Sequence, residues 1–212
     1  MMNKYFAIGI PTINQGDYLQ STLQLYQDDF PDTQIYILDN GLQNFGKQFH
    51  NVEVVRNFDP FCIAKSWNWL AKKIYEDHEY ALILNDDIYL GAGTKEIVSL
   101  LKKPADIYCA EYDYDHFSAF ILPKKTFDET NGFDEEYTGC YYEDKDFLRS
   151  LSVVHEKTPV FTSVLNSTFF RRNSSVTKDP KLNEGRQINE TRYITKWGGP
   201  LRSETFKTPF NK

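Results

Sequence analysis

Short apolar runs alternate with amphipathic segments along the first half of the chain. The runs are rich in β-branched and aromatic residues and end in polar or turn-forming residues, which is typical of strands. They cover residues 5–10 (YFAIGI), 34–39 (QIYILD), 52–55 (VEVV) and 80–84 (YALIL). Apolar residues at helical spacing predict helices after an N-capping Asp17 and over residues 64–74 and 94–101. Strands that alternate with helices in this way predict a parallel sheet built from βαβ units.

The second half of the chain has a different character. Two strands of a mixed extension, a loop that enters a helix, and a further strand are predicted, in that order, at residues 105–110, 118–123, 132–151 and 158–165. From Asn166 onward the composition is polar. We expect a helix there that begins near Pro180 and ends near Trp197, before a Gly-Gly-Pro stop.

Polar side chains cluster where the predicted strands end. Thr12 and Asn14 follow the first strand, Asp39 and Asn40 end the second, and residues 85–87 (NDD) follow the fourth. In open parallel sheets, ligands bind beyond the carboxyl ends of the strands. Paired carboxylates at such an end can hold a hard divalent cation. A turn or a helix cap is the alternative reading of an Asp-Asp pair taken by itself.

Composition and charge narrow the class of protein. The 212 residues are 41% apolar and 16% aromatic, which predicts a packed domain, and no apolar run approaches the roughly 20 residues that span a bilayer. The three cysteines (Cys62, Cys109 and Cys140) are odd in number and widely spaced, which argues against a disulfide framework and a zinc site and favours a cytoplasmic location. Residues 166–212 carry ten basic and four acidic side chains, on an otherwise acidic chain of net charge −6. So acidic a body excludes nucleic acid as a partner.

Several segments in order give the chain a family resemblance. IPTINQG, IYILDNG, IAKSWNW, LILNDDI, NGFDEEYTGCYYEDKDFLRS and YITKWGG together resemble the GT-A glycosyltransferases of the family 2 type, over about residues 5–200. The resemblance extends to glycosyltransferase domains of large algal viruses, which would place the protein in a host cytoplasm. It implies an α/β GT-A fold: a Rossmann-like, mostly parallel mixed sheet flanked by helices in a single domain.

The resemblance also divides that domain. Residues 1–104 would bind the nucleotide sugar, residues 105–165 would form the acceptor and catalytic half, and residues 166–212 would form a basic segment. Charge placement suggests that this segment closes as a lid over a diphosphate, through Arg171, Arg172, Lys178 and Lys196. The domain would be either the whole protein or a piece of a longer one.

The resemblance assigns roles residue by residue. The nucleotide-sugar site would comprise Pro11, Thr12, Asn14, Asp39, Asn40, Lys65, Asn68, Asn85 and Asp86. Asp39 would accept the N3–H of uracil, and Asp86 would contact the ribose. For Lys65 a solvated surface position, and for Asn68 a structural role, are the alternatives. Asp87 would hold Mn²⁺ or Mg²⁺ on the diphosphate. Asn166, His155 or water would complete the metal site, and His116 would touch the donor sugar.

The catalytic pair implied by the resemblance is Asp144, as the general base, with Glu143 orienting it or holding the acceptor; Asp146 and Arg149 would make structural pairs. The implied reaction is an inverting hexosyl transfer from a UDP-sugar, UDP-glucose or a UDP-deoxyhexose such as UDP-rhamnose, to a glycan hydroxyl. The alternatives are an inactive nucleotide-sugar or carbohydrate-binding module, or a sugar-nucleotide nucleotidyltransferase. The nucleotidyltransferase would want a basic, glycine-rich loop after the first strand, where IPTINQGDYL has one glycine and no Lys or Arg.

Overall fold

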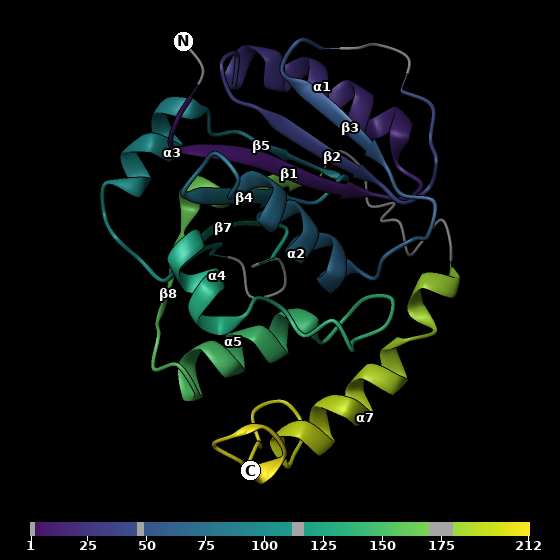
Figure 1. The fold of residues 1–212 in the computed structure, drawn as a ribbon, viewed down its shortest axis with the longest axis vertical. Coiled ribbons are helices and arrows are strands. Elements are labelled where there is room, and N and C mark those ends of the chain that lie inside the picture. The colour runs from purple at the N-terminus through teal and green to yellow at the C-terminus, as the bar shows by residue number, and fades with distance from the viewer. Residues whose placement is uncertain (1–2, 46–48, 112–116, 170–179) are drawn as a thin grey trace.

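The computed structural model describes residues 3–45, 49–111, 117–169 and 180–212, which form one α/β domain around a central sheet (Figure 1). The strands of that sheet lie in the order β3-β2-β1-β4-β7-β6-β8. Their bounds are β1 Phe6–Thr12, β2 Ile35–Asp39, β3 Val52–Arg56, β4 Tyr80–Leu84, β6 Ile107–Ala110, β7 Ala119–Pro123 and β8 Pro159–Thr162. Only β7 runs antiparallel to its neighbours. The predicted mixed, mostly parallel sheet in a single domain is confirmed.

Helices connect and cover the strands. The α-helices are α1 Gly16–Asp29, α2 Ile63–Ile74, α3 Thr94–Leu101, α4 Lys124–Thr130, α5 Glu143–Val153 and α7 Arg186–Trp197, and short 3₁₀ turns cover Ser163–Leu165, Pro180–Asn183 and Pro209–Asn211. The helices expected between the early strands, after the 132–142 loop and before the Gly-Gly-Pro stop are therefore present. Helix α4 was not predicted, because its seven residues (KKTFDET) carry no clear apolar period.

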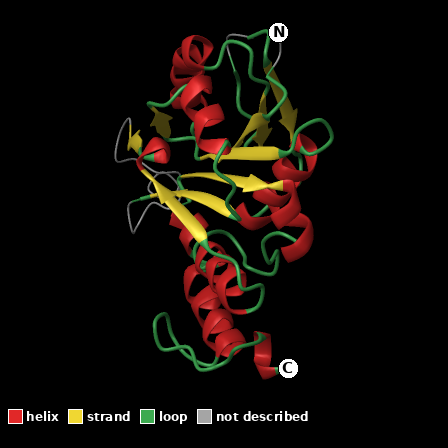
Figure 2. Cartoon of the chain, turned by 90° about the vertical axis from the view of Figure 1, so that its left-hand side faces the viewer, coloured by secondary structure: helices red, strands yellow, loops and turns green. Residues whose placement is uncertain are grey.

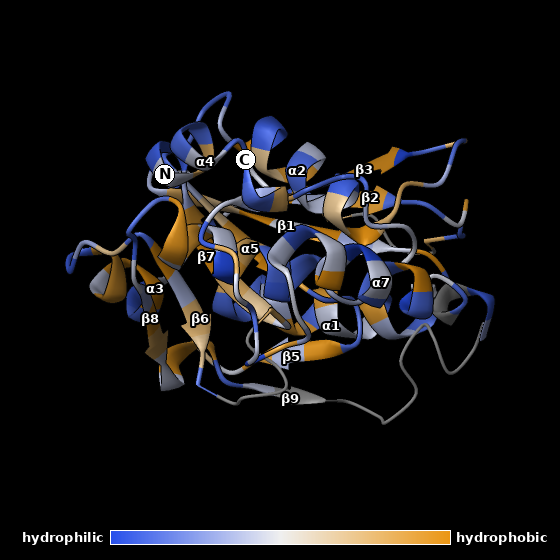
Figure 3. Ribbon diagram, turned by 90° about the horizontal axis from the view of Figure 1, so that it is seen from below, coloured by the Kyte–Doolittle hydropathy of each residue, from blue (hydrophilic) through white to orange (hydrophobic). Residues whose placement is uncertain are grey.

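Both faces of the sheet are buried, which explains why its strands read as continuous apolar runs. Phe6, Ile8 and Ile10 of β1 pack in the cluster that contains α1 and Ile97 of α3. Ala7 belongs to the opposite cluster, which contains α2 and α5. A Cβ on Gly9 would lie 3.1 Å from Cβ of Leu70 in α2, so glycine lets this helix approach the sheet. Figure 3 shows the strands mostly in the hydrophobic colours and much of the helix surface in the hydrophilic ones.

Three local details differ from the sequence prediction. Strand β5 (Ile88–Leu90) starts directly after Asp87 and pairs antiparallel with β9 (Ser167–Phe169), which makes a small second sheet. The strand expected to reach residue 165 ends at Thr162, whose side chain caps a 3₁₀ turn. Helix α1 begins before Asp17, because the amide of Gly16 finds its acceptor in a distant side chain, Oε1 of Gln43, at 2.6 Å.

The strand ends that matter for the site lie together. Parallel pairing aligns the ends of β1, β2 and β4. Strand β7 pairs antiparallel with both β4 and β6, and so brings the end of β6 beside the end of β4. We call this border, where residues 12, 39, 84 and 110 end their strands, the carboxyl edge. Helix α7 lies beyond α5, at the end of the molecule away from the N-terminus (Figures 1 and 2).

Candidate active site

A chain of hydrogen bonds joins three strand ends at the carboxyl edge. The side-chain amide of Gln43 donates to Oδ1 of Asp39 at 3.1 Å and to the hydroxyl of Thr12 at 3.0 Å. That hydroxyl in turn donates to the carboxylate of Asp86. The structure therefore brings together the predicted residues Thr12, Asp39 and Asp86. Gln43, which links them, was missed, because nothing in its local sequence marks a loop glutamine as a connector.

Asp86 and Asp87 differ in burial although they are neighbours. The side chain of Asp86 is buried, and its burial raises its pKa to about 7, with a further upward contribution from the charge of Asp87. The hydrogen bonds from Thr12 and from the backbone amide of Ile13 act in the opposite direction. Asp87 is half-buried. Repulsion between the two carboxylates would be relieved by a cation bound at Asp87.

The donor set decides which kind of metal site fits. Among the described residues, no three His, Cys, Asp or Glu side chains gather into a potential metal cage. Mg²⁺ and Mn²⁺, however, are often held by one or two carboxylates while substrate phosphates and water supply the other oxygens. Asp87 fits such a shared site.

Asp39 and Asn40 shape the loops at the edge. The carboxylate of Asp39 is fully buried and accepts the amides of Gly41 at 3.0 Å and Gln43 at 2.7 Å. Asn40 donates to the hydroxyl of Ser66 at 3.1 Å and accepts the amide of Phe61 at 3.1 Å, which ties β2 to α2. Their oxygens are thus already bonded within the protein.

Among the predicted residues near α2, Asn68 lies away from the edge. Its side chain is buried and exchanges hydrogen bonds with the backbone of Phe133, at 2.8 and 2.9 Å, and donates to Glu135 at 2.9 Å. A Cβ on Gly132, which has φ +68°, would collide with its amide oxygen. The proposed contact of Asn68 with the nucleotide sugar is replaced by the structural role that was the alternative.

Pro11, Asn14, Lys65 and Asn85 lie in or next to the elements that meet at the edge. Pro11 is buried in β1, Asn14 follows that strand, and the amide of Asn85 donates to the carbonyl of Ser118 at 2.9 Å. Lys65 is in the first turn of α2, with its Nζ 4.1 Å from the centre of the Phe61 ring.

The N-terminus of α5 is presented by strained backbone. Tyr141 and Tyr142 have φ of +78° and +74°, in the left-handed region that costs a non-glycine residue about 1–3 kcal/mol. Glu143 follows and is 5% exposed, with a buried Oε2 that has no hydrogen-bond partner among the described residues. Burial raises the pKa of Glu143 to about 8, and the charge of Asp144 adds to the rise. Strain and an unpaired buried carboxyl together mark a functional position.

Asp144 has the opposite environment. Its side chain is 23% exposed, Oδ2 lies 3.3 Å from Nζ of Lys145, and Oδ1 accepts the Lys145 amide at 2.8 Å. Of the two predicted catalytic carboxyls, Asp144 is therefore the one with the more exposed side chain, and Glu143 is the buried one.

Packing connects the turn at Tyr141–Asp144 to the strand end at residues 85–87. The amide of Ile63, at the start of α2, donates to the carbonyl of Gly139 at 3.0 Å. The ring of Phe117, next to the residue that binds the Asn85 amide, lies 6.4 Å from the ring of Phe147, one turn along α5 from Asp144. Phe117 and Phe147 therefore pack the first turns of α5 against the segment that pairs with the end of β4. That Asp87 and Asp144 face one site stays a prediction.

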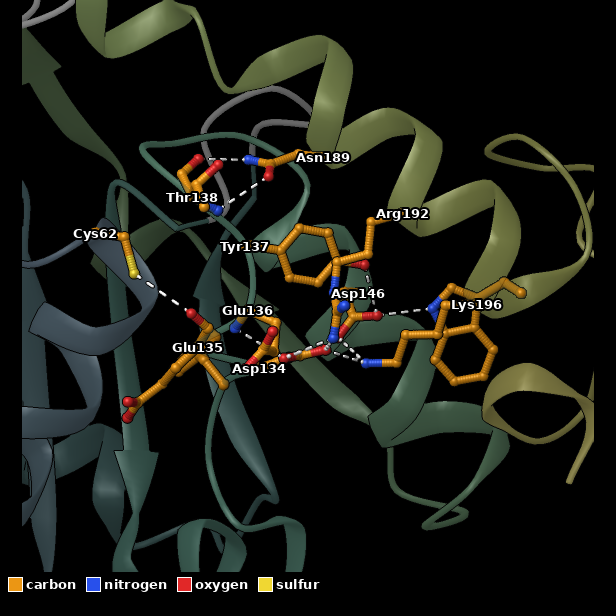
Figure 4. A network of polar contacts seen from close by, with 12 residues as sticks. Cys62, Asp134, Glu135, Glu136, Tyr137, Thr138, Asp146, Asn189, Arg192 and Lys196 are labelled. Atoms are coloured by element: carbon orange, nitrogen blue, oxygen red, sulfur yellow. Dashed lines mark hydrogen bonds and ion pairs between the residues drawn. The ribbon is translucent and has the colours of Figure 1, made fainter.

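The prediction that Asp146 is structural is confirmed (Figure 4). Asp146 is buried and accepts the Tyr137 hydroxyl at 3.0 Å, the Trp197 indole at 2.8 Å and Nζ of Lys196 at 2.9 Å. Lys196 also lies 2.8 Å from Asp134. Lys196 is consequently not a lid residue, because it is 7% exposed and held by two carboxylates. Arg149 is likewise structural, since it donates to the carbonyl of Phe206 at 3.0 Å.

The remaining metal-ligand candidates lie in different parts of the chain. His155 lies past the C-terminal end of α5, at the other end of that helix from Glu143 and Asp144, and its role as a third ligand stays a prediction. The amide oxygen of Asn166 accepts the Glu111 amide at 2.9 Å, at the end of β6. His116 and the predicted lid residues Arg171, Arg172 and Lys178 lie outside the described residues.

No helix in the described part of the chain is long and apolar enough to cross a membrane. No family model and no curated protein matches the sequence. Solved structures, in contrast, match the fold across most of the chain.

A mannosyltransferase of Pyrobaculum calidifontis, in complex with GDP-Man and Mn²⁺, is 11% identical with a TM-score of 0.66, over 92% of this chain and 65% of that one. TarS of S. aureus is 13% identical with a TM-score of 0.59, over 90% and 40%. A mutant Drosophila β1,4-galactosyltransferase 7, in complex with manganese, UDP-Gal and xylobiose, is 11% identical with a TM-score of 0.56, over 81% and 72%. Likeness at these identities concerns the fold alone, and it shows that the chain has the α/β fold of GT-A type.

Proposed function

We propose that this protein is a metal-dependent glycosyltransferase of the family 2 type, which moves a hexose from a UDP-sugar to a glycan hydroxyl with inversion. One observation carries the proposal. Strand β4 runs directly into Asp86 and Asp87, and α5, which begins with a buried Glu143 and a partly exposed Asp144, packs through Phe147 against Phe117, beside the residue that binds the Asn85 amide. Solved structures of the same fold hold GDP-Man with Mn²⁺ and UDP-Gal with manganese, which supports a nucleotide-sugar donor and a divalent ion.

Each group at the edge has a role in this proposal. Asp87 would hold the divalent ion, and when bound that ion would supply positive charge to the departing nucleoside diphosphate. The Gln43–Thr12 hydrogen bonds fix the carboxyl of Asp86 in place for the ribose. Lys65, with its amine beside the Phe61 ring, contributes positive charge near the nucleotide. The first strand of the small sheet, β5, starts directly after Asp87, whose side chain is half-buried.

Asp144 removes the proton from the acceptor hydroxyl as that oxygen attacks the anomeric carbon. Attack from the face opposite the leaving group inverts the anomeric centre. Glu143 has a pKa raised to about 8, so its carboxyl is largely protonated at pH 7 and donates a hydrogen bond to the acceptor. Asp144 thus accepts a proton, whereas Glu143 keeps its proton and donates a hydrogen bond.

The uridine preference is proposed from Asp39. Its carboxylate already accepts from Gly41 and Gln43, so the N3–H of uracil would have to share Oδ1 with the Gln43 side chain or displace it. A Gln43→Ala variant tests this step directly. Easier access of uracil to Asp39 would leave UDP binding intact or tighter, whereas a loss of UDP binding alone would show that Gln43 contacts the nucleotide. UDP-glucose and UDP-deoxyhexoses such as UDP-rhamnose are the proposed donors.

A donor and acceptor screen tests the proposal. Thermal shift should show stabilisation by a UDP-sugar that requires Mn²⁺ or Mg²⁺. Release of UDP should then depend on an added glycan. Asp87→Asn should abolish the metal-dependent shift, while Asp77→Asn, an exposed residue after α2 at the opposite sheet edge, should leave it unchanged. Metal-dependent binding without release of UDP under any acceptor would instead identify a binding module.

A further inference from the structure

Helix α7 contacts the catalytic segment along one continuous face. We define the 134–146 segment as the stretch that runs from the loop before Tyr137 to the first turn of α5. Residues of α7 spaced by three or four positions touch it: Arg186, Asn189, Arg192, Tyr193, Lys196 and Trp197. This C-terminal helix therefore packs on the part of the chain that presents Glu143 and Asp144.

Asn189 contacts the segment through four hydrogen bonds. It is 1% exposed, and its amide nitrogen lies 2.8, 3.1 and 2.9 Å from the carbonyl oxygens of Thr138, Cys140 and Tyr141. Its amide oxygen accepts the Thr138 amide at 3.0 Å, and Figure 4 shows the two hydrogen bonds between Asn189 and Thr138. Backbone carbonyls that converge in this way repel one another unless a donor lies between them. The Asn189 side chain is that donor.

The carbonyls held by Asn189 belong to the strained part of the segment. Tyr141 and Tyr142 both have positive φ, and Glu143 follows at once. The guanidinium of Arg186 lies 5.2 Å from the centre of the Tyr141 ring, and the rings of Tyr142 and Tyr193 are 5.6 Å apart. An unfavourable backbone conformation persists only where its surroundings determine it. Here those surroundings are supplied by α7.

The contact between α7 and the segment is close. A Cβ on Gly185, just before α7, would collide with the carbonyl oxygen of Thr138. The aromatic residues that join the two form their own cluster, Tyr137, Tyr193 and Trp197, separate from the two clusters on the faces of the sheet. Loosening of this junction can consequently disturb the segment without unfolding the sheet.

We propose that Asn189 is a positioning residue: through the carbonyls of residues 138, 140 and 141 it holds the strained turn that sets the position of Glu143 and Asp144. It contacts neither donor nor acceptor and acts on turnover alone. The inference rests on the proposed transferase function for its kinetic consequence, but its structural consequence is independent of that function.

Kinetics test the first consequence. Asn189→Ala should lower kcat about 100-fold while KM for the UDP-sugar stays within twofold, because displacement of a reacting group by about 1 Å has an effect of that size. Asn189→Asp keeps an oxygen that accepts the Thr138 amide. It replaces the amide donor by a carboxylate oxygen, which the three carbonyl oxygens repel. Its kcat should be equally low at pH 7.5 and should recover in part at pH 5.5, where protonation restores a donor. Thr195→Ala, exposed on the same helix, is the matched control.

Thiol labelling tests the second consequence without any substrate. Cys140 lies in the held turn and Cys109 is fully buried in β6. Asn189→Ala should raise the rate of alkylation of Cys140 at least tenfold, as followed by peptide mass spectrometry, and leave that of Cys109 unchanged. Should Asn189→Ala fail to fold, Arg186→Ala removes a milder contact with the same turn and should raise the Cys140 rate by a smaller factor.

The outcomes separate the two ideas. If the unmodified protein transfers no sugar, the proposed function fails, and the labelling of Cys140 against Cys109 alone decides the role of Asn189. Three results would overturn the positioning role. They are an unchanged kcat in Asn189→Ala, an equal rise in the alkylation rates of Cys109 and Cys140, and a higher KM with an unchanged kcat.

Discussion

Two buried carboxyls three residues apart on α5 have opposite surroundings. Asp146 is 2% exposed and accepts hydrogen bonds from Tyr137, Lys196 and Trp197. Glu143 is 5% exposed, yet its Oε2 has no hydrogen-bond partner within the described part of the chain. The two carboxyls are buried to a similar extent, but only Asp146 has hydrogen-bond donors that compensate for the loss of water. A buried carboxyl whose partners are complete stabilises the fold, whereas one that lacks a partner has a place for a substrate group.

The difference comes from what each face of α5 meets. Helix α7 supplies a cation and an indole to the face that carries Asp146. The surroundings of Glu143 contain the thiols of Cys62 and Cys140, each of whose pKa values is raised first by burial and also by the charge of Glu143. Neutral thiols stabilise no negative charge. The pKa of Glu143 is raised to about 8, first by burial and then by the charge of the partly exposed Asp144.

The largest expected effect is on activity, at Asp144. Asp144→Asn should lower the rate of sugar transfer about 10³-fold, because the amide cannot accept the proton of the acceptor hydroxyl. Thermal unfolding should change little, since the side chain is 23% exposed and its ion pair with Lys145 is at the surface. Initial rates and a melting curve on the same preparation measure both. If Asp144→Asn remained active, another residue would have to be the general base.

The next effect is on stability, at Asp146. Asp146→Asn should lower the free energy of unfolding by about 3 kcal/mol, because the buried amine of Lys196 keeps Asp134 but loses one of its two carboxylates. Urea unfolding followed by circular dichroism measures the loss. Asp128→Asn, an exposed residue of α4, is the control and should change stability by under about 0.5 kcal/mol. If Asp146→Asn unfolded at the same urea concentration as the wild type, the hydrogen bonds of Asp146 would not stabilise the fold, and its contrast with Glu143 would be lost.

Local patterns were sufficient to predict the framework of the fold. The four early strands and the helices between them follow from apolar periodicity, and parallel pairing then placed residues 12, 39 and 85–87 at one edge. The α5 helix after the GFDEE loop was also predicted. These features depend on residues near one another in sequence, which is why a sequence alone specifies them.

Features that depend on distant partners could not be predicted. Asn189 bonds residues about 50 positions earlier, Asn68 bonds Phe133, and Gln43 bonds Thr12. Neither the polar character of these side chains nor their spacing reveals which backbone groups they meet. The pairing of β5 with β9 is unpredictable for the same reason. The wrong assignment of Lys196 to a lid followed from counting charges without knowing that Asp134 and Asp146 bury it.

The pH dependence of the unfolding free energy tests whether the Glu143 carboxyl is protonated in the folded protein. Its pKa is about 8 in the folded chain against an ordinary value of 4.5, so between these values the folded state binds the proton more strongly than the unfolded state. The contribution of Glu143 to stability is complete below pH 4.5 and is lost as the pH rises toward 8. Glu143→Gln cannot ionise and should escape this loss.

The variant should match the wild type near pH 4.5 and exceed its unfolding free energy at pH 8 by on the order of 4 kcal/mol. Urea titrations at half-unit pH steps give the difference curve. Glu136→Gln, on the exposed part of the preceding loop, should give a flat difference. Asp86, whose pKa is raised to about 7, contributes to both curves equally and cancels. A Glu143→Gln curve parallel to the wild type would mean that the buried carboxyl is ionised.

The smallest effect is expected at Lys145, a partly exposed residue that follows Glu143 and Asp144 in α5. Its amine lies 3.3 Å from Asp144 and lowers the pKa of Glu143 against the larger effect of burial. Lys145→Ala should leave stability at pH 4.5 unchanged and lower it by about 0.5 kcal/mol at pH 8, because a higher pKa at Glu143 enlarges the loss described above. Lys125→Ala, with an 82% exposed side chain, is the control and should show no such trend. The effect should also vanish in the Glu143→Gln background, since an amide has no charge for the lysine to stabilise; persistence there would assign it to the pair with Asp144 instead.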